Sequence, residues 1–69
     1  MISQDLQREI ASFAINANPE EVCGFVVDGQ LMPCANIHES PCTNFAIAAE
    51  DYVKAEELGN IEAIYHSHN

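Results

Sequence analysis

Basic residues and tryptophan are scarce in this sequence: among 69 residues it has no Trp and only two basic side chains, Arg8 and Lys54. Eleven Asp and Glu residues give it a formal net charge of −9. Such a chain lacks the clustered Lys and Arg that bind the phosphate backbone of a nucleic acid. An anionic membrane surface is disfavoured for the same reason. We therefore expect neither nucleic-acid nor membrane partners, and the dispersed acidity favours solubility or attraction of a basic protein.

Long apolar runs are also missing. No stretch approaches the roughly 18 apolar residues of a membrane span, and the polar N-terminus has no apolar segment of the kind found in secretory signals. The three cysteines, Cys23, Cys34 and Cys42, are odd in number and show no CxxC spacing. Reduced thiols and a cytoplasmic location are expected, rather than a disulfide framework.

Hydrophobic residues nevertheless make up 48% of the chain, which is enough for one small globular domain. Residues 3–17 have the periodicity of an amphipathic helix, with Ser3 as its N-cap and Asn18-Pro19 at its end. The spacing predicts a single buried stripe on this helix, formed by Ile2, Leu6, Ile10, Phe13, Ala14 and Ala17.

The remaining pattern predicts a hairpin, a second helix and a third strand. Residues 22–27 are apolar throughout and should be buried on both faces. Asp28-Gly29 is a favoured hairpin turn, and Pro33 places the following strand at an edge. A polar loop then leads to a helix over 49–58 and a strand over 61–66 that can pair with the first strand. The expected fold is therefore α/β with a mixed sheet.

The chain ends with two histidines, His66 and His68, separated by one residue. Because residues i and i+2 of a strand point to the same face, both imidazoles can project together. Two imidazoles are a start for a zinc site, although a catalytic zinc ion normally has three protein ligands. Glu20 and Glu21 precede the first strand and point differently, so one of them can face into a site. A glutamate beside zinc-activated water is the requirement for hydrolysis.

Three segments together, "EEVCGFVV", "NFAIAAEDYVKAEELG" and "IEAIYHSHN", resemble the JAMM/MPN+ zinc metallopeptidases. Within that family the chain is most similar to phage tail assembly proteins of the lambda K type. The resemblance extends from Pro19 to the end of the chain. Its markers are a glutamate three residues before a strand glycine, and an HxH motif that closes a later apolar strand.

The resemblance implies that Glu21 is the catalytic glutamate and that His66 and His68 are zinc ligands. In the family, a serine and a ligating aspartate follow the HxH motif by about ten residues. It thus implies that residues 1–69 form the N-terminal part of one JAMM/MPN-like domain, inactive alone. Asn69 stands where the family often has proline, and Ser67 should point away from the histidines. The expected activity is cleavage of a peptide or isopeptide bond, with phage tail proteins as candidate partners.

Two other functions remain open from the residues. The domain can be a non-catalytic scaffold of the same fold that binds tail or assembly proteins, and an uncovered sheet makes self-association plausible. A cysteine hydrolase using Cys42 with a histidine is the third hypothesis. Cys23 and Cys34 are expected to pack as small hydrophobes. His38 is expected in a surface loop and Phe45 in the core.

Overall fold

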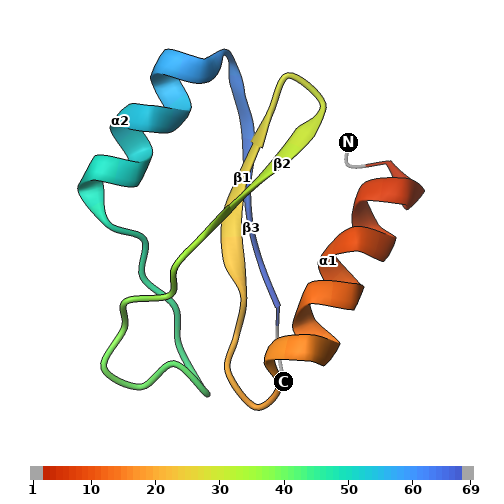
Figure 1. Ribbon diagram of the computed structural model, residues 1–69, viewed down its shortest axis with the longest axis vertical. Helices are drawn as coiled ribbons and strands as arrows, with labels where there is room; N and C mark the ends of the chain where they lie inside the picture. Colours follow the sequence, from red (N-terminus) through yellow and green to blue (C-terminus); the bar gives the residue numbers. More distant parts are fainter. Residues whose placement is uncertain (1–2, 68–69) are drawn as a thin grey trace.

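A three-stranded sheet with one helix on each side forms the molecule (Figure 1). The computed structural model describes residues 3–67. The elements, in chain order, are α1 (Gln4–Ala17), β1 (Cys23–Val27), β2 (Gln30–Cys34), α2 (Ala49–Leu58) and β3 (Ile61–His66). The strand order is β2-β1-β3, and both pairings are antiparallel. The predicted α/β order is therefore confirmed, including the pairing of the last strand with the first. The sheet itself is antiparallel throughout rather than mixed, because β1 forms a hairpin with β2 and β3 runs opposite to β1.

Strand β1 occupies the centre of the sheet, and all five of its residues are buried. Its hairpin with β2 turns at Asp28 and Gly29, whose φ angles of 47° and 79° fit a type I′ turn. Val27 and Gln30 close that turn as a hydrogen-bonded pair. Since such pairs alternate with non-bonded ones, Pro33 falls at a position whose N–H would point outward from the edge strand. The proline therefore costs the ladder no hydrogen bond.

The hydrophobic core lies between β1 and α2. Phe25 and Ala55 are fully buried there, and Val27 packs with them. The ring of Tyr52 meets Phe25 edge-to-face, with the ring centroids 5.2 Å apart. Partly buried side chains surround this cluster: Met32, Cys34, Ile47 and Ile61. One face of β1 is thus covered by α2 and the segment that precedes it.

Helix α1 lies on the other side of the sheet and is packed less deeply than its periodicity predicts. Ser3 caps it as expected, its Oγ accepting a hydrogen bond from the Leu6 N–H at 3.2 Å. None of its residues is buried, however, and Phe13 is 39% exposed. The predicted buried stripe is wrong in this respect, and Ile2 lies outside the described residues. Periodicity identifies the apolar side of a helix, but burial of that side depends on the area of the surface opposite it. Three short strands offer too little area to cover the apolar side of α1.

A pocket of about 370 Å³ separates the C-terminal half of α1 from the sheet, and Phe13 and Tyr65 are among its lining residues. Neither helix in residues 3–67 has the length and apolarity needed to cross a membrane.

Gly24 and Tyr65 face each other on the α1 side of the sheet. They are paired in register, and a Cβ atom on Gly24 would lie 2.7 Å from the Tyr65 ring and hydroxyl and would also collide with the Met32 carbonyl. Tyr65 is 4% exposed, and its hydroxyl has no hydrogen-bond partner among the residues described. Burial raises the pKa of Tyr65 to about 12. The glycine is therefore required by the position of the tyrosine ring.

Gly24→Ala is expected to destabilise the fold by at least about 2 kcal/mol, because the added methyl group overlaps a backbone carbonyl and a buried ring. Urea denaturation followed by circular dichroism measures the change in the free energy of unfolding. Gly29→Asn is the matched control: no atom lies within 4 Å of a Cβ there, and asparagine tolerates the positive φ. Equal losses in the two variants would contradict the steric explanation.

Tyr65→Phe should leave stability at neutral pH unchanged or slightly higher, because it removes a buried hydroxyl without a described partner. In the wild type, both states keep the phenol protonated below pH 10. Between pH 10 and about 12 the unfolded chain ionises while the folded chain resists, so stability falls as pH rises, by about 2–3 kcal/mol in total. Unfolding free energies measured across this range should lack that slope in Tyr65→Phe. Parallel pH profiles for both proteins would refute the assignment.

Candidate functional site

Glu21 lies at the entry to β1 with its side chain shielded from water. Only 6% of that side chain is exposed, whereas the neighbouring Glu20 is exposed. The two glutamates therefore point differently, as the sequence predicts. Glu21 comes two residues before Cys23, which places it on the face of β1 that carries Phe25. A buried carboxylate is costly unless it has polar partners, so its surroundings are informative.

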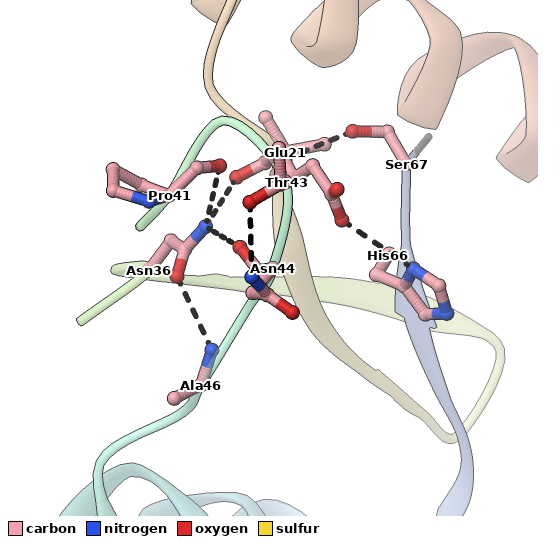
Figure 2. Close-up of polar contacts among 9 residues, drawn as sticks. Glu21, Asn36, Pro41, Thr43, Asn44, Ala46, His66 and Ser67 are labelled. Carbon is pink, nitrogen blue, oxygen red and sulfur yellow. Dashed lines mark hydrogen bonds and ion pairs between the residues drawn. The ribbon is translucent and has the colours of Figure 1, made fainter. Parts of the chain in front are cut away.

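Among the described residues, Glu21 forms an ion-pair contact with His66, the last residue of β3. His66 pairs in register with Cys23 and so shares the face of Glu21. Its Nδ1 lies 3.9 Å from Glu21 Oε1, and one third of its side chain is exposed (Figure 2). This separation is too long for a direct hydrogen bond but short enough for an ion pair when the imidazole is protonated. Folding thus brings together a shielded carboxylate and a partly exposed imidazole that are 45 residues apart in the sequence.

The imidazole of His66 also contacts an aromatic side chain. Phe45 stacks on it, with ring centroids 4.4 Å apart and an angle of 16° between the planes. Phe45 is half-buried, so the prediction that it belongs to the core is only partly right. Its stacking on His66 restricts the orientation of the histidine ring.

Asn36 joins the loop after β2 to the start of β1. Its side-chain amide donates to three carbonyls, those of Glu21 at 2.9 Å, Asn44 at 3.0 Å and Pro41 at 3.4 Å. Its Oδ1 accepts from the N–H groups of His38 and Ala46. Figure 2 shows the contacts of Asn36 with Glu21, Pro41, Asn44 and Ala46. Sequence reasoning missed Asn36, because an asparagine in a polar loop gives no signal of the backbone groups it will meet.

The hydroxyl of Ser67, which the sequence predicts to point away from the histidines, binds the chain at the end of β3 to the residue before β1. The Oγ accepts a hydrogen bond from the Val22 N–H at 2.9 Å, while the Ser67 N–H donates to the Val22 carbonyl at 3.0 Å. The residue between the two histidines is therefore bound directly to the residue after Glu21. His68 lies outside the described residues, so the shared face of the two imidazoles stays a prediction.

The described residues supply His66 as a candidate ligand for zinc. Within residues 3–67, no group of three or more His, Cys, Asp or Glu side chains is arranged to hold a metal ion. A carboxylate next to an imidazole can nevertheless exchange protons with a water molecule or substrate between them. The arrangement suits acid–base chemistry, and a metal would need ligands in addition to those described.

Cys23 and Cys34 pack as small hydrophobic residues, as predicted. Cys23 is buried, and its thiol is 3.8 Å from the carbonyl oxygens of Cys34 and Ala35. Burial raises the pKa of both Cys23 and Cys34, which lowers their thiolate fraction. Cys42 is exposed as predicted, and in the described part of the chain no hydrogen bond joins it to His38. His38 Nδ1 instead accepts from the Ser40 N–H, as befits a loop residue.

One comparison with known proteins gives a partial match. The chain is 36% identical over 63 residues to the tail tip assembly protein K of Escherichia phage N15, a match that covers 86% of this chain. It spans only about a quarter (26%) of that relative's length. No protein-family model matches the sequence, and no solved structure matches it. The similarity to a phage tail assembly protein is thus a finding, and the JAMM/MPN+ resemblance stays a prediction.

Proposed function

We propose that these residues belong to a zinc-dependent hydrolase of the peptidase type that acts in phage tail assembly. The observation that carries the proposal is the meeting of Glu21 and His66, 45 residues apart in the chain, at 3.9 Å on one face of the sheet. The similarity to a tail tip assembly protein supports the biological setting. The JAMM/MPN+ resemblance of the surrounding segments supports the chemistry.

The donor set fits zinc in kind. His66 presents a partly exposed imidazole next to a carboxylate, and we assign His66 and His68 as the ligands. When bound, zinc supplies a Lewis acid that makes water a better nucleophile at neutral pH. Glu21 is the general base that takes a proton from the water and then returns it to the leaving amine.

The proposed activity is that of the whole protein. A catalytic zinc ion normally has three protein ligands, and the resemblance places the third, an aspartate, beyond Asn69. Residues 1–69 alone are therefore expected to be inactive. The substrate is a peptide or isopeptide bond of a protein, with phage tail proteins in the host cytoplasm as the proposed partners.

A non-catalytic scaffold is the second candidate, and the exposed apolar side chains of the described residues favour it. In that case the domain would bind tail or assembly proteins through its surface. Exposed apolar side chains available for this include Tyr52, Val53 and Ile64. Self-association through the same side chains is opposed by the net charge of −9.

Zinc titration separates the two candidates. The longest reading frame that contains these residues should bind one zinc ion at micromolar concentration or tighter, and His66→Ala should weaken that binding at least about tenfold through loss of a ligand. Isothermal titration calorimetry measures both values. His38→Ala is the matched control, because His38 is a loop histidine bonded to Ser40. Equal affinities for the wild type and His66→Ala would exclude His66 as a ligand.

The catalytic role of Glu21 is tested in the longest reading frame that contains these residues. Chelator-sensitive cleavage of a tail protein is expected there, and Glu21→Gln should lower its rate by about 100-fold or more while zinc stays bound. Glu20→Gln, which changes the adjacent exposed carboxylate, should cleave at the wild-type rate. Undiminished cleavage by Glu21→Gln would rule out the proposed base.

A further inference from the structure

The peptide bond between Glu21 and Val22 is held on both sides by side chains. Its carbonyl, from Glu21, accepts a hydrogen bond from Asn36 Nδ2 at 2.9 Å. Its N–H, from Val22, donates to Ser67 Oγ at 2.9 Å. Asn36 follows β2 and Ser67 follows β3, so the two side chains reach this peptide bond from the two edge strands (Figure 2).

The backbone of Glu21 is fixed further by its own N–H, which donates to the Pro41 carbonyl at 2.7 Å. Every backbone polar group from the Glu21 N–H to the Val22 carbonyl is therefore hydrogen-bonded, the last of them to the Ser67 N–H. Ladder bonds between strands normally satisfy such groups. Here Asn36 and Ser67 replace them just before β1 begins, where the catalytic candidate lies.

Asn36 reaches a second part of the site as well. Its amide donates to the carbonyl of Asn44, and its Oδ1 accepts from the N–H of Ala46 at 3.2 Å. These two residues flank Phe45, the ring that stacks on His66. A single side chain thus holds both the backbone that carries the carboxylate and the ring that orients the imidazole.

We infer that Asn36 and Ser67 are positioning residues that clamp the Glu21–Val22 peptide bond and so direct the Glu21 carboxylate toward His66. Asn36 and Ser67 hold the peptide group after Glu21, and the bond from the Glu21 N–H to the Pro41 carbonyl holds the peptide group before it. Fixing both peptide groups fixes the direction of the Glu21 Cα–Cβ bond, and with it the starting point of the side chain. An effect of these two residues on catalysis rests on the proposed function, whereas their effect on the orientation of the Glu21 side chain does not.

The chemistry of the clamp requires these side chains. Asparagine combines a two-hydrogen donor with an acceptor, and Asn36 uses both. Aspartate has the same shape but, when ionised, only accepts, so Asn36→Asp would set a carboxylate against three carbonyl oxygens. Ser67 needs a hydroxyl on Cβ, which threonine retains and alanine lacks. Asn36→Asp and Ser67→Ala therefore disrupt the hydrogen bonds, whereas Ser67→Thr keeps the hydroxyl.

The test compares Ser67→Ala, Ser67→Thr and Asn36→Asp with the wild type by NMR, using Ser12→Ala on the exposed surface of α1 as the control. Hydrogen exchange at the Val22 amide reports the Ser67 bond, and three-bond Hα–Hβ couplings report the χ1 rotamer of Glu21. Ser67→Ala should speed Val22 exchange about 3- to 10-fold, as expected for the loss of one hydrogen bond, and average the Glu21 couplings. Phe25, at the centre of β1, should exchange as before.

Ser67→Thr should restore both values, and Asn36→Asp should average the Glu21 couplings. A single Glu21 rotamer in both Ser67→Ala and Asn36→Asp would overturn the inference, and so would exchange at Phe25 that rises as much as at Val22. If Asn36→Asp does not fold, Ser67→Ala and Ser67→Thr decide alone. Zinc affinity is read separately in the longest reading frame that contains these residues. A wild type that binds no zinc there refutes the proposed function and leaves the couplings as the test of the clamp.

Discussion

The antiparallel pairing of β1 with β3 is the interaction on which the rest of the structure depends. It places His66 opposite Cys23 and continues, through Ser67, to Val22. Glu21 and His66 are 45 residues apart in the sequence and would not meet without this pairing. Strand β1 would also lose the neighbour that makes it the central strand. Formation of the sheet therefore assembles the candidate site, at the point where β1 begins and β3 ends.

The two faces of the sheet differ in how closely their helix packs against them. On one face, α2 buries Phe25 and Ala55 in a small core, and the loop before it carries Phe45 to the imidazole. On the other face, α1 leaves a pocket and the closest contact is that of Tyr65 with Gly24. Glu21 contacts His66 on the face that carries Phe25, and it is also among the residues that line the pocket beside α1. Its backbone hydrogen bonds supply the rigidity that a positioned acid–base pair needs.

The polar loop between β2 and α2 has a structural role that its composition hides. Asn36, Pro41 and Phe45 all come from it, and each contacts Glu21 or His66. Loops of this kind commonly carry functional groups on a rigid sheet. In this protein the loop mainly supports groups that the strands present, through backbone hydrogen bonds made by one asparagine.

The sequence by itself determined the order of the elements, the central position of the apolar strand 22–27, the Asp28-Gly29 turn and the edge position of Pro33. These features follow from local periodicity and backbone preferences, which act over a few residues. It also indicated Glu21 and His66 as candidates for one site. Only the tertiary structure decided the shallow packing of α1, the stacking of Phe45 on His66 and the roles of Asn36 and Ser67. Those depend on contacts between residues far apart in the chain, which no local pattern encodes.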